Sequence, residues 1–440
     1  MAKPTDRNGR DGLKGLTGQR QPLVAAIDLG ASKIGCFIMK PDGAVRDTRE
    51  VQVAGVGYVQ SRGVRGGAIV DVEEAAHALA QAVDKAERLA GVTVGGVVLT
   101  TAGGQLASVR LNAQVSLGAR PISDHDLSRA LQMALAQARF PGRRAIHLLP
   151  ISWSVDGQRN VRDPRNMFGK VLGLELLVVT VAETAWATLA QCVEMVHLQL
   201  EGVVAAPFAS ALAALEEDEM DLGCVCIDMG GGSTSAAVFS GGSLVHVDSL
   251  GVGGMHVTQD IARGLSTTVA GAERIKTLHG SAIASANEDR ETIEAPPRGD
   301  DPAAGPVVAP RSLLKGVIAP RVEETLELMR DRLKQAGVLV DPGASVVLTG
   351  GASQLCGVRE VAYRVFDRQV RLARPRRAPH LAESAAGPAF SAAAGVLQRS
   401  AFGPREAVPS RQLAGRPAAT PVDPGANVIH RAAGWLRANL

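Results

Sequence analysis

The first hundred residues alternate short apolar runs with polar, glycine-containing turns. Apolar runs of strand length lie at Leu23–Ile27, Gly35–Met39, Val51–Val56 and Gly96–Thr100. Between the last two, apolar residues recur with a period of about 3.6, which predicts a helix over Val72–Leu89. Three strands, a helix and a further strand indicate a mixed α/β fold.

A smaller module follows at roughly residues 104–178. It contains a predicted helix over Ser123–Ala138, with Ser123 as its N-cap and two acidic residues in its first turn. A strand is predicted at Ala145–Leu149. We therefore expect a small α+β module inserted into the first half of the fold.

The opening pattern recurs in the second half of the chain. A strand is predicted at Cys224–Asp228, followed by three glycines and another strand at Ser235–Phe239. Asp28 and Asp228, which end the two leading strands, are separated by 228 − 28 = 200 residues. This recurrence predicts an internal duplication, in which two similar lobes face each other across a cleft.

Three segments lack hydrophobic periodicity. Residues 1–20 are predicted to be a disordered arm without the apolar run of a signal peptide, residues 286–310 a mobile surface loop, and residues 401–426 a flexible linker. Nowhere do 18 apolar residues follow one another, so a membrane-spanning helix is not expected.

Composition narrows the classes of function. Hydrophobic residues make up 46% of the chain, charged residues 21%, and the formal net charge is +3, as in a soluble globular protein. No basic block has interleaved aromatics, so nucleic acid is not an expected partner. The five cysteines lack CxxC spacing, which indicates a reducing cytoplasm rather than a zinc site or disulfide framework.

The turn after the first strand carries candidate chemistry. Its functional positions are Asp28, Gly30, Ser32 and Lys33. Backbone N–H groups in such a turn can cradle phosphate oxygens, while a carboxylate at the strand end can hold Mg²⁺ directly or through water. Turns of this kind are common in loops, so a purely structural role is the alternative.

The second turn is more specific. After Asp228 the chain has the positions Gly230, Gly231, Gly232, Ser233 and Thr234. Three consecutive glycines cost backbone entropy on folding, and they leave space where a phosphate can approach. An ordinary hairpin rarely uses all three, which favours a phosphate site.

A third strand and glycine turn complete the set. The run Val346–Thr349 is followed by Gly350, Gly351 and Ala352, and a helix is predicted at Val358–Phe366. A nucleoside fits against such a turn, although a lone Gly-Gly after a strand is more often structural. The three turns in this order indicate a nucleotide site.

These segments resemble the phosphate-1, phosphate-2 and adenosine motifs of the actin, sugar-kinase and heat-shock-chaperone superfamily. The resemblance implies a two-lobed actin-like ATPase fold, with duplicated ribonuclease-H-like lobes closing on ATP and Mg²⁺. It also implies that Asp28 and Asp228 face the metal from opposite sides, through water. We can assign no water-activating residue, so at most a slow ATPase is expected; His147 could be a base, but a structural role is the simpler interpretation.

Within that superfamily the chain is similar to the FtsA family of cell division proteins. The similarity is carried by Gly253–Leu265, Ala272–Lys276 and, in the inserted module, Trp153–Gly157. It implies that Gly254 lies at the nucleotide and that Glu273 and Lys276 lie near the nucleoside. Their i, i+3 spacing on a helix points both side chains the same way, and an exposed ion pair is the alternative.

The resemblance also divides the chain. It implies that lobe 1 is formed by a core at residues 21–103 and by two later segments, 179–204 and 376–400, with the inserted subdomain at 104–178. Lobe 2 is formed by a core at 205–258 and 321–375, with an outer subdomain 2B at 259–320 between these two segments. After the linker, residues 427–440 are predicted to form an amphipathic helix.

In that last helix Val428, Ile429, Trp435, Leu436 and Leu440 fall in one arc of roughly 160°. A basic amphipathic helix on a flexible linker is suited to lie in a membrane interface, and a helix docked on the protein body is the alternative. The corresponding segment of the family is its membrane anchor.

The resemblance implies a peripheral protein at the cytoplasmic face of the inner membrane, at the division septum. It would self-assemble, tether FtsZ filaments through the FtsZ C-terminal peptide, attach to anionic lipid and recruit later division proteins. The alternatives are a small-molecule kinase and a pilus-assembly protein of the same superfamily. Neither has a use for the C-terminal helix.

Overall fold

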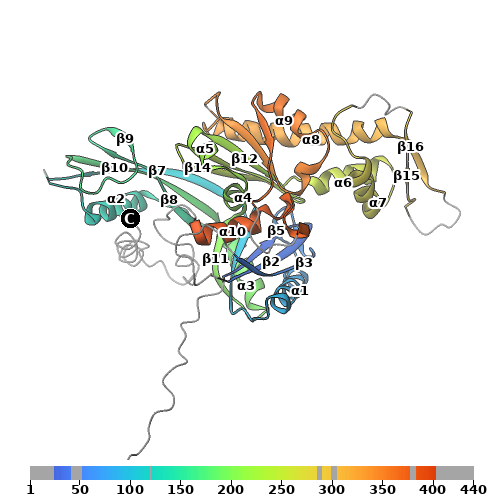
Figure 1. Cartoon of the computed structure of the whole chain (residues 1–440), viewed down its shortest axis with the longest axis horizontal. Helices are drawn as coiled ribbons and strands as arrows, with labels where there is room; N and C mark the ends of the chain where they lie inside the picture. Colours follow the sequence, from blue (N-terminus) through green and yellow to red (C-terminus); the bar gives the residue numbers. More distant parts are fainter. Residues whose placement is uncertain are drawn as a thin grey trace, which may run out of the picture.

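The computed structural model describes residues 24–40, 52–118, 120–284, 290–298, 305–339, 341–376 and 383–402. The expected N-terminal arm, nearly all of the linker and the C-terminal helix lie outside these residues. The described chain forms two sheet-based lobes, one below the other in Figure 1, with a module extending to the left and a helical extension to the right.

Lobe 1 is a five-stranded sheet in the order β11-β6-β1-β2-β3. Its strands are β1 (Val24–Leu29), β2 (Lys33–Lys40), β3 (Gln52–Gln60), β6 (Gly96–Thr101) and β11 (Gln199–Ala205). The first three strands are antiparallel, and β6 lies parallel to β1 and to β11. A short hairpin, β4 (Val64–Arg65) and β5 (Ala68–Ile69), follows β3.

Lobe 2 repeats this arrangement in the order β14-β13-β12-β17-β18. Its strands are β12 (Cys224–Met229), β13 (Thr234–Ser240), β14 (Ser243–Leu250), β17 (Ser345–Thr349) and β18 (Val370–Leu372). Again three antiparallel strands come first, and two parallel strands extend the sheet from β12. The duplication predicted from the recurring turns is therefore confirmed.

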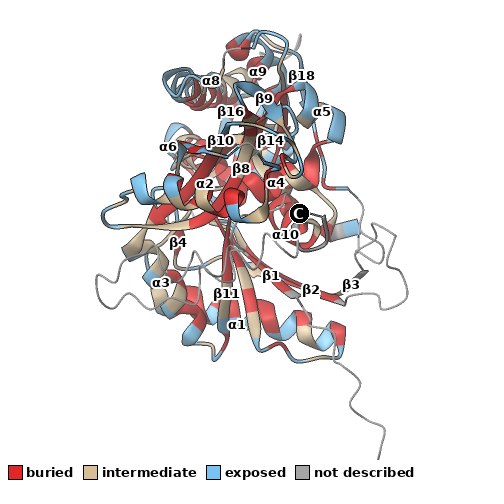
Figure 2. Ribbon diagram, turned by 90° about the vertical axis from the view of Figure 1, so that its left-hand side faces the viewer, coloured by how far each residue is buried: buried red, intermediate tan, exposed pale blue. Residues whose placement is uncertain are grey.

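Local signals set the bounds of the lobe 1 helix α1 (Val72–Ala90). Asp71 caps its start by accepting a hydrogen bond from the Glu74 backbone N–H at 3.1 Å, and Gly91 ends it with φ +65°. The helix covers β2 and β3 with an alanine-rich face and leaves its outer face exposed (Figure 2). The neighbouring helix α3 (Glu183–Glu194) packs beside it.

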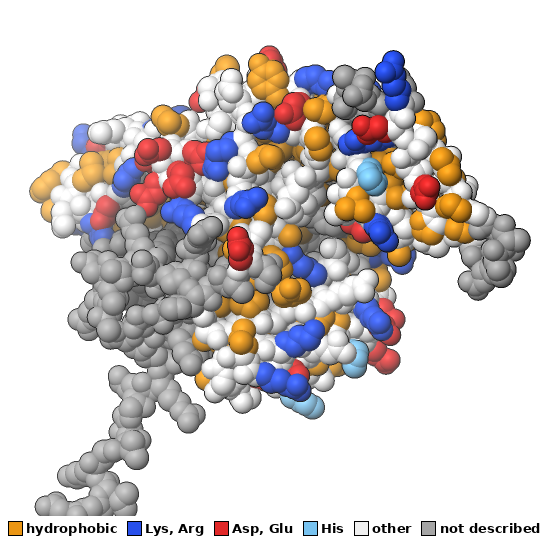
Figure 3. Space-filling view, turned by 45° about the vertical axis from the view of Figure 1, so that its right-hand side comes forward, with side chains coloured by type: hydrophobic (Ala, Val, Ile, Leu, Met, Phe, Trp, Pro, Cys, Tyr) orange, Lys and Arg blue, Asp and Glu red, His pale blue; other side chains and the backbone are white. Residues whose placement is uncertain are grey.

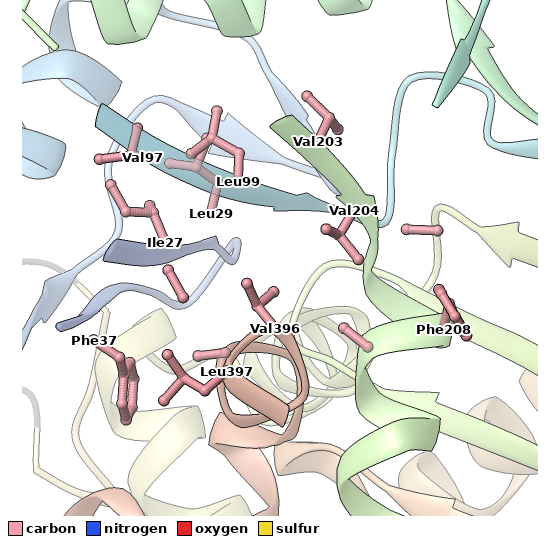
Figure 4. Close-up of a cluster of buried hydrophobic side chains, with 14 of the residues drawn as sticks. Ile27, Leu29, Phe37, Val97, Leu99, Val203, Val204, Phe208, Val396 and Leu397 are labelled. Atoms are coloured by element: carbon pink, nitrogen blue, oxygen red, sulfur yellow. The ribbon is translucent and has the colours of Figure 1, made fainter. Parts of the chain in front are cut away.

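Two helices fill the space between the sheets. α4 (Ala206–Ala214) packs on the lobe 2 sheet, α10 (Ser391–Phe402) packs on the lobe 1 sheet, and the two pack on each other. A Cβ at Gly395 of α10 would overlap the backbone of Ala209 of α4, so this approach requires glycine. Figure 4 shows Val396 of α10 turned toward the apolar side chains of lobe 1, and Phe208 of α4 belongs to the same buried cluster.

The inserted module is a four-stranded sheet with one helix. It comprises β7 (Ala107–Ser116), α2 (Asp124–Gln137), β8 (Arg143–Val155), β9 (Gln158–Val161) and β10 (Val171–Ala182), with sheet order β7-β10-β8-β9. Ser123 is the N-cap of α2, as predicted, and forms a capping box with Asp126. Asp126 is fully buried and pairs with Arg120 at 2.8 Å, which holds the pKa of this carboxyl well below its usual range.

The extension of lobe 2 is mostly helical. It contains α6 (Gly254–Gly264), α7 (Val269–His279) and part of α8 (Arg311–Gln335). The helix α9 (Val358–Phe366) connects β17 and β18 of the lobe 2 sheet, and α5 (Glu217–Leu222) precedes β12. Part of segment 286–310, expected to be an irregular loop, instead forms the antiparallel pair β15 (Thr292–Ala295) and β16 (Val307–Pro310). The alternating residues Ile293, Ala295 and Ala309 are buried, and this short period-2 pattern was hidden among prolines and glycines.

Candidate functional site

The two aspartates of the recurring turns are the next-to-last residues of equivalent central strands, β1 and β12. In lobe 1, Asp28 pairs with Gly35 on β2 and with Thr100 on β6. In lobe 2, Asp228 pairs with Ser235 on β13 and with Thr349 on β17. Both carboxylates line one cavity between the lobes, so the duplication brings together two acidic groups that are 200 positions apart in sequence (228 − 28).

The two carboxylates have different hydrogen-bond partners. Thr100 Oγ1 donates to Asp28 Oδ1 at 2.6 Å from the neighbouring strand of the same sheet. Ser210 Oγ donates to Asp228 Oδ2 at 2.5 Å from α4, a helix that packs on the lobe 2 sheet rather than a neighbouring strand. Burial raises the pKa of Asp28, and burial together with the charge of Asp28 raises the pKa of Asp228 to about 6.

Lys33 supplies the cation of the same cavity. Burial lowers the pKa of its ammonium to about 8, against the opposing effect of the charges on Asp28 and Asp228. Its Nζ lies 3.3 Å from the ring centroid of Phe390, in the short helix η3 (Pro388–Phe390) that precedes α10. The cavity therefore contains one ammonium and two carboxyl groups, all from half-buried residues.

The glycines of the second turn allow the two lobes to approach closely. A Cβ at Gly232 would come within 2.5 Å of the Ala31 Cβ, and a Cβ at Gly231 would come within 3.0 Å of the Ser32 Cβ. Gly230 closes the turn by donating its N–H to the Ser233 carbonyl at 2.8 Å. Larger side chains here would separate the phosphate-1 and phosphate-2 turns.

The third turn approaches the same cavity from β17. Gly350 has φ +86°, and a Cβ there would collide with the Asp228 carboxylate. Gly351 and Ala352 begin the short helix η1 (Gly351–Gln354). The cavity is lined by residues from all three turns: Asp28, Gly30, Ser32, Lys33, Asp228, Gly230, Gly231, Gly232, Ser233, Gly350 and Gly351.

A second, larger cavity of about 1180 Å³ adjoins the first and shares Ser32, Gly231 and Gly351 with it. Its wall includes Gly254, Glu273, Lys276 and Ala352, together with Thr234. The Thr234 hydroxyl is buried and has no hydrogen-bond partner in the described part of the chain. A cavity of this size, next to a narrow glycine-lined one, has room for a nucleoside beside its phosphates.

Glu273 and Lys276 do form the ion pair that their spacing allowed, at 2.7 Å, but they also line this cavity. Lys276 Nζ donates to Thr258 Oγ1 at 2.8 Å and to the Gly254 carbonyl at 3.2 Å. Thr258 Oγ1 approaches Glu273 Oε2 at 2.5 Å. The pair is thus held at the start of α6, at the wall of the cavity. The two alternatives considered from the sequence, an ion pair and a position near the nucleoside, are therefore compatible.

Several residues of the site could not be found from the sequence. Thr100, Ser210 and Phe390 stand in no motif, and only the tertiary structure brings them to the carboxylates and to Lys33. His147 lies away from this cavity. It is fully buried, accepts a hydrogen bond from the Ala205 N–H at 3.0 Å and contacts the Phe208 ring, as a structural histidine does.

The residues present fit Mg²⁺ bound together with phosphate rather than a site built from protein ligands alone. Within the described ranges no cluster of three or more histidine, cysteine, aspartate or glutamate side chains could hold a metal ion. Mg²⁺ commonly uses one or two carboxylates and takes its remaining ligands from water and phosphate. Two half-buried carboxylates beside a glycine-lined cavity match that donor set.

Two duplicated lobes with a glycine-lined cavity between them define the class as an actin-like ATPase fold, as predicted. The fold is similar to that of the protein in "PilM-PilN type IV pilus biogenesis complex", with a TM-score of 0.59 and 17% identity, covering 86% of this chain and 98% of that chain. MreB5 of Spiroplasma citri bound to ADP gives a TM-score of 0.51 at 15% identity, covering 87% and 97%.

Sequence comparison identifies the family within this class. Family models for "Cell division protein FtsA" and "SHS2 domain inserted in FTSA" match residues 225–395 and 103–180. FtsA of Agrobacterium fabrum is 43% identical over 391 residues, 88% of each chain. FtsA of Pseudomonas aeruginosa is 30% identical, covering 96% of this chain and 99% of its own. The chain belongs to the FtsA family of cell division proteins, as the sequence motifs predicted.

Proposed function

We propose that this protein binds ATP with Mg²⁺ between its lobes and tethers FtsZ filaments to the cytoplasmic face of the inner membrane at the division septum. In this proposal, ATP favours a closed, polymer-competent arrangement, and the assembled protein recruits later division proteins. The observation that carries the proposal is the convergence of Asp28, Asp228, Lys33 and three glycine turns on one cavity.

The chain's own groups account for phosphate binding. The glycine turns expose backbone N–H groups, Ser32 and Ser233 add hydroxyl groups, and Lys33 adds a positive charge. When bound, Mg²⁺ supplies the positive charge that neutralises phosphate oxygens. The site carries two acidic groups and one ammonium, so the cation also offsets the repulsion between the carboxylates.

Contacts between the lobes support a role for the nucleotide in holding them closed. Ser249 of lobe 2 donates a hydrogen bond to the Ala102 carbonyl of lobe 1. Ser243 of lobe 2 donates to the Ile151 carbonyl of the inserted module at 2.8 Å. A nucleotide contacting both phosphate turns adds to the contacts between the lobes, so its binding favours the closed arrangement.

The membrane attachment rests on the sequence of residues 427–440, which lie outside the described residues. Among the helices that the structure describes, none has the length and apolar character needed to cross a membrane. We propose that the amphipathic arc around Trp435 binds the interface reversibly. Several tails on one polymer would bind together, because each attached subunit raises the effective concentration of the next.

The extension of lobe 2 offers a surface for the FtsZ peptide. Leu278 of α7, Val308 of β16 and Leu313 of α8 are all exposed, and Arg311 ties α8 to the end of α7 through the His279 carbonyl at 3.3 Å. Figure 3 shows hydrophobic side chains gathered at this end of the molecule. Exposed apolar clusters of this kind mark interaction sites.

Val308→Glu tests this surface, with Val70→Glu as the matched control because Val70 is equally exposed on lobe 1. We expect the first change, and not the second, to weaken binding of the FtsZ C-terminal peptide in solution, with ATP affinity unchanged. Equal peptide affinity for both variants and wild type would place the FtsZ surface elsewhere.

Co-sedimentation with anionic vesicles, with and without ATP and Mg²⁺, tests the whole proposal. Wild type should pellet more fully with ATP. Trp435→Glu should abolish pelleting, because losing one large apolar contact costs up to about 3 kcal/mol and the new carboxylate adds repulsion from the lipid.

His430→Glu is the control for the tail, since it introduces the same charge outside the apolar arc. It should retain most of the binding, and both variants should bind ATP normally. If Trp435→Glu pellets as fully as wild type, the tail is not the anchor.

A further inference from the structure

The Lys33 ammonium has an unusual environment for a charged group in a narrow cavity. In the described part of the chain it forms no ion pair and no side-chain hydrogen bond; its close partner is the Phe390 ring, 3.3 Å from Nζ to the ring centroid. Neither Asp28 nor Asp228 pairs with it, although their charges act on its pKa. An aromatic face attracts an ammonium through its quadrupole and leaves N–H donors of the ammonium unused, since a single N–H directed at the ring is enough for the contact.

The position of Phe390 is fixed from several sides. Its ring meets Phe37 and Tyr58 edge-on, with centroids 5.8 and 5.5 Å away. The next residue, Ser391, hydrogen-bonds Thr349 of lobe 2 through their hydroxyl groups at 2.7 Å, and both residues are buried. The ring therefore rests on lobe 1, and the backbone beside it is joined to lobe 2.

We propose that Phe390 is a positioning residue for phosphate binding: its ring holds the Lys33 ammonium at the phosphate cavity and leaves the N–H donors that do not face the ring free for phosphate oxygens. This inference rests on the proposed binding of ATP. The segment around Phe390 lies at the cavity, since Pro388, Ala389 and Ser391 line it together with Lys33.

The ring also keeps the two aspartates available. An ammonium drawn into an ion pair with Asp28 or Asp228 would occupy a carboxylate that the magnesium ion needs, and phosphate would have to break that pair to gain the lysine. A ring imposes no such competition. Phe390 thus keeps the Lys33 ammonium from pairing with the carboxylates of Asp28 and Asp228.

The nucleotide-free protein provides the first test. In protein labelled with ¹³C at the lysine ε-carbon, the Lys33 signal, identified by its loss in Lys33→Met, should show an upfield ring-current shift. Phe390→Leu should abolish this shift and lower the pH at which Lys33 titrates, because the charged form loses its ring contact. Tyr58→Leu, which removes a neighbouring aromatic residue and keeps the Phe390 ring, should preserve the shift. A Lys33 signal without an upfield shift in wild type would overturn the inference.

ATP affinity, measured by isothermal titration, provides the second test. Phe390→Leu should weaken ATP binding about 2- to 30-fold, as expected for loss of one cation–π contact. Phe390→Tyr, which keeps the ring, should restore most of the affinity. In a Lys33→Met background, Phe390→Leu should have no further effect, because the pair acts as one unit.

An equal loss in both backgrounds would show that Phe390 acts through packing alone and would overturn the inference, while the proposed nucleotide site would stand. Absence of ATP binding by folded wild-type protein would instead overturn the proposed function and, with it, the role of Phe390. Thermal unfolding of each variant separates these results from loss of the fold.

Discussion

The two lobes share one sheet order, yet they support their central aspartates in different ways. Asp28 accepts its hydrogen bond from Thr100, which stands directly across the parallel strand pair in the same sheet. Thr349 holds the equivalent place beside Asp228 but bonds Ser391 at the start of α10. Asp228 depends instead on Ser210 of α4.

This difference shows that the two lobes share the strand order and the turn geometry but not the side chains that support the aspartates. The strand order and the turn geometry recur, because one backbone solution places a carboxylate at a strand end in each lobe. The helices between the sheets break the symmetry. In lobe 2 both polar contacts at the strand ends reach α4 and α10, so the cavity is joined to the helices that separate the sheets.

The largest expected effect comes from filling the contact between the two turns. Gly232→Val should abolish detectable ATP binding, because its side chain would overlap Ala31 and force the phosphate turns apart. Gly95→Val is the matched control, since a Cβ there meets nothing within 4 Å. Isothermal titration measures both variants; a Gly232→Val protein with unchanged affinity would contradict the assignment of these turns to phosphate.

Both aspartates should make the stability of the folded protein depend on pH, because burial raises the pKa of each. The folded protein holds the Asp228 proton up to a pKa of about 6, whereas the ordinary value is 3.8. Between these pH values the folded state binds more protons, so its free energy of unfolding falls as pH rises, by about 3 kcal/mol at most.

Asp228→Asn removes that penalty. Above pH 6 the nucleotide-free variant should therefore unfold at a higher temperature than wild type, while its Mg²⁺-dependent ATP affinity falls because the cation loses a carboxylate. Asp28→Asn should change both quantities in the same directions, since burial also raises the pKa of Asp28. Thermal melts at pH 5 and pH 8 check the sign; a lower melting temperature for Asp228→Asn at pH 8 would contradict it.

The smallest effects should come from removing the hydrogen-bond donors to the two aspartates. These donors are the clearest difference between the two lobes. Ser210→Ala should raise the pKa of Asp228 above about 6 and reduce the free energy of unfolding at pH 8 by about 1–3 kcal/mol, because an ionised carboxylate loses its donor. Thr100→Val, a change of similar shape, should act in the same way on Asp28 alone. Denaturant melts of both single variants and the double variant would show whether the donors act independently. Strong non-additivity would mean that the carboxylates titrate as one pair.

Much of this molecule was determined by the sequence itself. Local rules placed the strand ends at Asp28 and Asp228, the cap of α2 at Ser123 and the helix Val358–Phe366, because each depends on neighbours in the chain. The recurring turns predicted two lobes, and the motifs indicated the family. The runs of glycine also indicated a close approach of the backbone, since only a residue without a side chain permits it.

Other features were decided only by the tertiary structure. Ser210, Phe390 and Ser391 lie in alanine-rich helices or short turns with no motif, and they reach the cavity because α4 and α10 cross between the sheets. The hairpin within 286–310 forms because its few apolar residues find a buried face on neighbouring helices. Such contacts join residues distant in sequence. Their free energy depends on packing between lobes, which no local pattern of hydrophobic and polar positions contains.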